Sequence, residues 1–168
     1  IRTAVVTGLA KLGPDAKEAV PALVAAIRAA YPAKSDPMKL EFEDQQGEAW
    51  ALLVTIGEPS VPLLTELLGH GNILVQRNAA EALGAIGSAA KPAADELKKL
   101  LQGMNANAAF SAAAALCRIG ANEQEALEAI RRGFAAPMPE VTMLALLTIP
   151  RMGEAGKPLI PEADRKST

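Results

Sequence analysis

Apolar residues recur along the chain in a helical pattern that is repeated five times. Each repeat is anchored by a glycine, and apolar residues lie one, four and eight positions before it. The anchors are Gly13, Gly57, Gly87, Gly120 and Gly153. Positions spaced in this way fall on one face of a helix with about 3.6 residues per turn. The glycine then ends the helix, because the left-handed conformation costs this residue least.

The apolar stripe is filled in all five repeats. From the position nearest the glycine outward, its members are Leu12, Ile56, Ile86, Ile119 and Met152, then Leu9, Leu53, Leu83, Leu116 and Ile149, then Val5, Ala49, Ala79, Ala112 and Ala145. A second apolar position follows ten residues after each of the first four glycines, at Leu23, Leu67, Leu97 and Ile130. The pattern therefore predicts a repeating unit of helix, tight turn and helix.

Prolines help to locate the second helices. Pro62 and Pro92 lie five residues after their glycines, where a proline in the first helical turn sacrifices no intrahelical bond. Pro150 falls inside the last of the first helices and should kink it. We expect paired helices near 1–12 and 20–30, 44–56 and 60–69, 73–86 and 91–102, 107–119 and 123–134, then 139–152 and a start at about 160.

The glycine anchors are separated by 44, 30, 33 and 33 residues. A helical pair of this length buries its stripe only by stacking on a neighbouring pair. We therefore expect one all-α domain over 1–168, with repeats at about 1–30, 44–70, 73–103, 107–136 and 139–168, the last one incomplete. The longer first spacing leaves an insertion at about 31–43.

Two stretches of the chain resemble a known repeat family. The string VQRNAAEALGAIG, residues 75–87, resembles the first helix of a HEAT repeat, of the short bacterial kind also seen in phycobilin lyases. The string LGPDAKEAVPALVAAI, residues 12–27, resembles the turn and second helix. The resemblance implies an α–α superhelix of about five HEAT-like pairs over the whole chain, with the second helices on the concave surface.

One family feature is mostly missing. Where these repeats commonly have arginine eleven residues before the glycine, the five positions here are Arg2, Gln46, Gln76, Ala109 and Thr142. We therefore expect the polar ladder between neighbouring repeats to be mostly absent.

Composition and charge narrow the class of partner. Hydrophobic residues make up 50% of the chain but aromatic residues only 3%, which favours helices packed closely on small side chains. A net charge of −2 gives no electrostatic reason to expect nucleic acid or an anionic membrane surface. No apolar run is long enough to span a bilayer, so we expect a soluble chain. It opens with Ile1 rather than methionine, which suggests a processed or excised segment of a longer protein.

Residues that could carry catalysis are few. His70 is the only histidine, and we interpret it as a loop residue rather than a metal ligand. This also weighs against the HEAT-repeat hydroxylases, which resemble this fold but hold iron through His–Glu pairs. Cys117, the only cysteine, falls three residues before its glycine and is interpreted as a small core residue without a base to activate it. A single cysteine is compatible with a reducing compartment. No cofactor or metal is expected.

Two groups of residues are candidates for contact with a partner. Lys98, Lys99, Arg131 and Arg132 lie eleven and twelve residues after the anchors of the third and fourth repeats. The resemblance would place them as a basic column on the concave surface, whereas the alternative is that they only complement the helix dipole.

The insertion supplies the second group, Tyr31 and Phe42, as possible anchors for a partner. The alternative is that both cover the exposed edge of the first pair while Trp50 packs within the second.

The function expected from these features is a noncatalytic scaffold module that binds protein or peptide and belongs to a larger protein. Near-neutral charge and the lack of a catalytic constellation support it. The alternatives are a phycobilin-lyase-like enzyme of chromophore attachment, which would use an acid and a tyrosine in an apolar groove, and a HEAT-like DNA glycosylase, which would need a strongly basic concave face.

Overall fold

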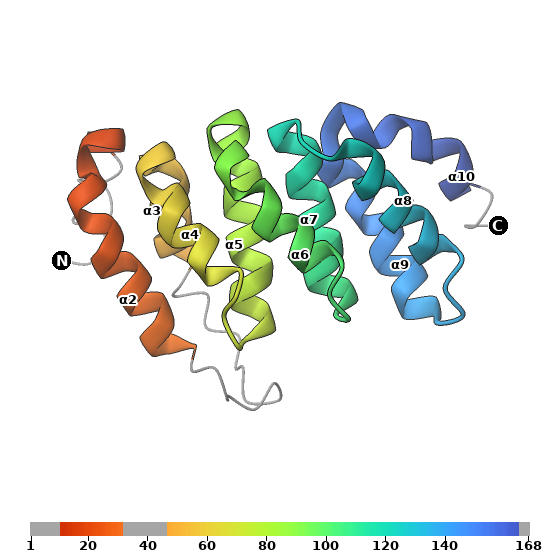
Figure 1. Ribbon diagram of the computed structural model, residues 1–168, viewed down its shortest axis with the longest axis horizontal. Coiled ribbons are helices and arrows are strands. Elements are labelled where there is room, and N and C mark those ends of the chain that lie inside the picture. Colours follow the sequence, from red (N-terminus) through yellow and green to blue (C-terminus); the bar gives the residue numbers. More distant parts are fainter. Residues whose placement is uncertain (1–10, 32–46, 165–168) are drawn as a thin grey trace.

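The fold is a stack of helical pairs that curves into an arc (Figure 1). The computed structural model describes residues 11–31 and 47–164. Within these two ranges every regular element is an α-helix or a short 3₁₀-helix, and no strand occurs. The all-α solenoid expected from the sequence is confirmed. Of the first predicted helix, only residues 11 and 12 fall within the described part of the chain.

Each pair joins a first helix to a second helix, usually through a 3₁₀ turn. The first helices are α3 (Gly47–Ile56), α5 (Ile73–Ile86), α7 (Ala106–Ile119) and α9 (Pro139–Thr148). The second helices are α2 (Val20–Ala30), α4 (Val61–Leu67), α6 (Ala94–Leu101), α8 (Glu123–Phe134) and α10 (Ile160–Asp164). The 3₁₀ turns are η1 (Gly13–Ala19), η3 (Glu58–Ser60), η4 (Gly87–Ala93) and η5 (Ile149–Leu159).

Three of the glycine anchors end first helices as expected: Gly57, Gly87 and Gly120 directly follow α3, α5 and α7, whereas Gly153 interrupts the segment η5. All five have positive φ, between 52° and 78°, a conformation that other residues rarely adopt. The stripe before them forms the core, because Leu53, Leu83 and Leu116 are completely buried. Leu12 is an exception and is more than half exposed.

The first helix of the last pair differs from its prediction. Instead of running to residue 152 with a kink, α9 ends at Thr148 and the chain continues as the 3₁₀ segment η5. Pro150 lies in the first turn of η5, where its missing N–H leaves no bond unmade.

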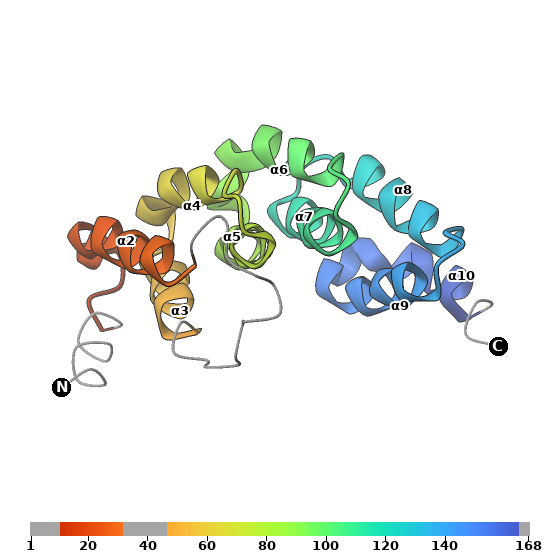
Figure 2. The ribbon, with the colours of Figure 1, turned by 90° about the horizontal axis from the view of Figure 1, so that it is seen from below.

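The two kinds of helix form two layers. Figure 2 shows α2, α4, α6 and α8 along the outer curve of the arc and α3, α5, α7 and α9 along the inner curve. The second helices therefore do not line the concave surface, which corrects the expectation drawn from the family resemblance. The inner, concave face is formed by the first helices.

Small side chains explain why the arc bends toward the first helices. Half of the fourteen residues of α7 are alanine, and nearly all of its side chains are buried. A Cβ atom added to Gly84 of α5 would lie only 3.0 Å from the Cα atom of Ala115 of α7, so these two helices approach closely. Because the inner helices pack at short range, the stack is shorter on the inner side and curves that way.

Candidate functional site

The basic residues predicted to form a concave column lie on the outer layer instead. Lys98 and Lys99 belong to α6, and Arg131 and Arg132 belong to α8. Three of the four are engaged by acids. Of these four, Arg132 alone is exposed and has no ion pair with the described part of the chain. Their role in partner binding stays a prediction.

Ion pairs connect several of the second helices to the next second helix along the chain. Arg28 of α2 lies 3.0 Å from Glu66 of α4. Lys98 of α6 lies 2.7 Å from Glu125 of α8, and Arg131 of α8 lies 3.1 Å from Glu162 of α10. Arginine is mostly absent from the position where the family commonly carries it, as the sequence indicates. These ion pairs instead supply a polar ladder between second helices.

Lys99 is the candidate that borders a surface hollow. Its Nζ lies 2.6 Å from Glu96 Oε1, and this hydrogen bond raises the pKa of Lys99. Both side chains line an open hollow of about 320 Å³ where the ends of α4 and α6 meet the start of α7. The ammonium is thus already neutralised by a carboxylate within the same hollow.

The predicted insertion falls mostly outside the described residues, and Phe42 lies there with it. Tyr31 is described: it follows the C-terminal end of α2, is half-buried and packs against the hydrophobic core. Trp50 of α3 is 8% exposed and belongs to the same core. Tyr31 is therefore in contact with the protein's own apolar interior.

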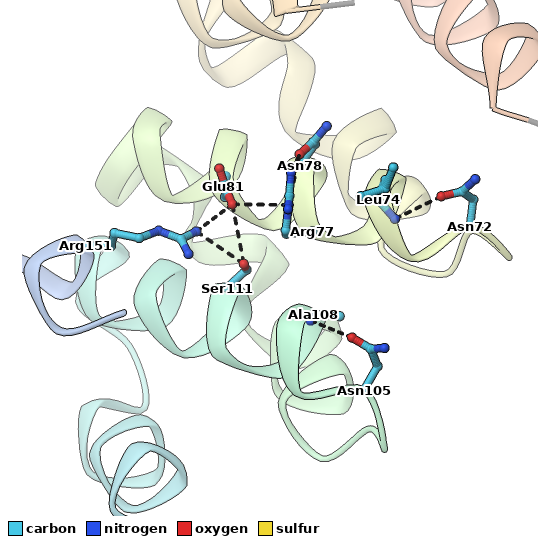
Figure 3. Close-up of polar contacts among 9 residues, drawn as sticks. All are labelled: Asn72, Leu74, Arg77, Asn78, Glu81, Asn105, Ala108, Ser111 and Arg151. Atoms are coloured by element: carbon cyan, nitrogen blue, oxygen red, sulfur yellow. Dashed lines mark hydrogen bonds and ion pairs between the residues drawn. The ribbon is translucent and has the colours of Figure 1, made fainter. Parts of the chain in front are cut away.

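A polar cluster on the inner layer is the feature that sequence reasoning missed. In Figure 3, Arg77 and Glu81 of α5, Ser111 of α7 and Arg151 of η5 converge. Arg151 Nη2 lies 2.6 Å from Glu81 Oε1 and donates to Ser111 Oγ at 3.2 Å. Arg77 Nε lies 3.7 Å from the same glutamate oxygen. Arg151 therefore bridges from η5 across α7 to α5. We call these four residues the inner cluster.

Helical register explains why the inner cluster faces the concave side. Glu81 follows Ala79 by two residues and precedes Leu83 by two, which is about 200° around the helix from each of these buried side chains. Ser111 is only 1% exposed, because the arginine above it and the close neighbours of α7 cover it.

Two exposed apolar side chains lie on α9, which directly precedes the segment η5 that carries Arg151. Met143 and Leu147 occupy the same offsets before Gly153 that Arg77 and Glu81 occupy before Gly87. They are 56% and 62% exposed. The concave face therefore combines unburied apolar groups with guanidinium groups.

The sequence contained a partial signal for this cluster. Arg77 and Glu81 form an i, i+4 pair, a spacing at which opposite charges meet on a helix. The link to Arg151, seventy residues further on, depends on how the helices stack, and no local spacing encodes it.

The remaining chemical candidates have structural roles. Cys117 is buried, and burial is the main cause that raises the pKa of its thiol to about 11, with the nearby charge of Glu123 adding to it. His70 is half-buried in the turn before α5, where its Nδ1 accepts a hydrogen bond from the N–H of Asn72 at 3.1 Å. Among the described residues, no three His, Cys, Asp or Glu side chains are grouped so as to hold a metal ion.

No helix in the described ranges is both long enough and apolar enough to cross a bilayer.

The fold defines the class of protein as an α-helical repeat solenoid. Residues 39–103, which span the second and third pairs, match the family model of HEAT repeats. This match identifies HEAT repeats in that part of the chain. No curated protein and no solved structure matches it.

Proposed function

We propose that the chain is a noncatalytic scaffold module of a larger protein that binds a protein or peptide on its inner face. HEAT repeats are commonly protein-interaction scaffolds, and the family is generally noncatalytic. A curved stack of helices offers an extended concave surface on which a partner can make many small contacts.

The observation that carries the proposal is the exposure of Met143 and Leu147 on α9. They are 56% and 62% exposed, although the helix that bears them belongs to the inner layer. Exposed apolar groups beside polar ones are typical of surfaces that a partner covers. The hydrophobic effect would stabilise a complex by about 1.5–3 kcal/mol for each such side chain that becomes fully buried.

The two enzymatic alternatives gain less support. Tyr31, the sole tyrosine, packs against the core at the end of α2, whereas chromophore attachment of the lyase type would need it in an open groove. A glycosylase would need a strongly basic concave face, and here Glu81 and exposed apolar side chains interrupt the basic groups.

A selection from a random dodecapeptide display library tests the proposal. The affinity of selected peptides is then measured for the native chain and for Leu147→Ser, with Ala22→Ser on the outer helix α2 as the control. We expect Leu147→Ser to weaken binding about tenfold, because a large apolar contact is lost. Equal affinities of both variants, or a stronger effect of Ala22→Ser, would show that the peptide does not bind on the inner face.

A further inference from the structure

We propose that the inner cluster is a docking site for a carboxylate side chain of a peptide, with an apolar neighbour of that residue packing on Met143 and Leu147. This inference rests on the proposed function and specifies the chemistry of its partner: a peptide segment that carries Asp or Glu beside a large apolar residue.

The inner cluster holds more positive than negative charge. Arg77 and Arg151 both approach one oxygen of Glu81, at 3.7 Å and 2.6 Å, and no second acid joins them among the described residues. An arginine carries five N–H donors. The bonds of Arg151 to protein groups use a single terminal nitrogen, Nη2. Both side chains remain about 40% exposed, so their other donors can reach a ligand.

A third guanidinium adds to this surplus. Arg118 is exposed and follows Ser111 by seven residues, which places both on the same face of α7. It has no ion pair within the described ranges. This stretch of the inner face therefore presents three arginines against one glutamate.

The ion pairs of the outer layer are arranged differently, although Arg132 on this layer has no ion pair among the described residues. There Arg28, Lys98 and Arg131 each face one carboxylate of a neighbouring helix. The contrast is that two arginines of the inner cluster share one glutamate, which favours a second carboxylate at this place. Guanidinium groups suit this ligand, because their planar fork matches the two oxygens of a carboxylate.

The surroundings favour a peptide over a nucleic acid. Phosphate backbones are bound by many clustered cations, whereas this chain has a net charge of −2. Met143 and Leu147 offer apolar contact that a phosphate backbone does not use but a Leu or Phe side chain does.

The test uses two random dodecapeptide libraries that differ only at one fixed central residue, Glu in one and Gln in the other. Clones selected from the Glu library are synthesised in both forms, and their affinities are measured by fluorescence polarisation. We expect the Glu form to bind the native chain about tenfold more tightly than the Gln form. For Arg151→Gln the ratio should fall below about threefold, because the charge partner is gone.

Glu81→Gln separates ligand binding from a purely structural role of the cluster. Removing the internal carboxylate frees both guanidiniums from a competing anion, so the Glu peptide should bind about threefold more tightly or better. A cluster that only stabilises the stack predicts lower stability and no gain in affinity. The control is Arg28→Gln, an exposed arginine of the outer layer in a one-to-one ion pair, which should leave the Glu-to-Gln ratio unchanged. Circular dichroism at the assay temperature establishes that each variant is folded.

Each outcome of this test has a distinct meaning. Peptides that bind the inner face equally well in Glu and Gln forms would overturn the carboxylate site and leave the proposed function standing. Failure of both libraries to yield any binder would contradict the carboxylate site and the proposed function together. A 20-base-pair duplex DNA that competes with the Glu peptide and binds more tightly than it would overturn the inference in favour of nucleic acid.

Discussion

Cys117 is the sole thiol of the chain, and it lies on α7, where nearly every side chain is buried. Burial raises the pKa of this thiol from its ordinary value of 9.0 to about 11. The thiolate is the reactive form, so at pH 8 its fraction falls about 100-fold relative to an unperturbed cysteine. We expect reaction with a disulfide reagent at pH 8 to be slower by at least that factor in the native chain than in urea.

The pH dependence of this reaction gives the sign of the shift. Because the raised pKa keeps the folded thiol protonated, the rate in the native chain should rise with pH up to about 11, instead of levelling off near 9. A native rate that levels off below pH 9 would show that Cys117 is accessible and not the core residue described above.

Gly84 is the residue that sets the distance between α5 and α7. An added Cβ would lie 3.0 Å from Ala115 Cα and 3.3 Å from Ala115 Cβ, closer than side chains tolerate without a shift of the backbone. We expect Gly84→Leu to lower the free energy of unfolding by about 2 kcal/mol or more, measured by urea denaturation. The matched control is Ala85→Leu at the next, exposed position, which should change it by less than about 0.5 kcal/mol. Equal effects of the two changes would contradict the close approach.

Among the elements, α7 begins at a side-chain cap. Asn105 precedes it in an extended conformation, and its side-chain oxygen accepts a hydrogen bond from the N–H of Ala108 at 3.1 Å (Figure 3). Asn105→Ala should lower the free energy of unfolding by about 1 kcal/mol, because an N–H at the helix start loses its partner. Asn107→Ala, two residues further on at an exposed position, is the control and should stay within about 0.5 kcal/mol of the native value. Thermal or urea unfolding of the two variants decides between them.

The sequence predicts the helices well because their signals are local. A glycine with positive φ, a buried stripe and a proline in the first turn lie within one unit and need no information from elsewhere. The departure at Pro150 is also local, but its outcome depends on a choice between a kinked helix and a 3₁₀ segment. In the 3₁₀ segment that forms, Ile149 and Met152 pack into the core, and each is less than 8% exposed.

At the scale of the whole molecule, the sequence did not predict which layer faces inward. The stripe defines the buried face of each helix, but the direction of curvature depends on how closely neighbouring helices approach. That distance follows from small residues distributed over several repeats, such as Gly84 and Ala115. The same reason explains why the inner cluster was missed: Arg151 and Glu81 meet only after three pairs have stacked.

The layer assignment changes which residues are expected to meet a partner. Partner contact by Arg132 of the outer layer and by Tyr31 at the end of α2 stays a prediction. The inner cluster and Arg118 lie on α5, α7 and η5, and the exposed Met143 and Leu147 lie on α9.

Site-specific photocrosslinking tests the central claim most directly. A benzophenone side chain is placed at position 147 on the inner face of α9 or at position 22 on the outer helix α2, and each protein is irradiated with a selected peptide. The account predicts a crosslinked product at position 147 and none at position 22, identified by mass spectrometry. Crosslinking from position 22 but not from position 147 would contradict it.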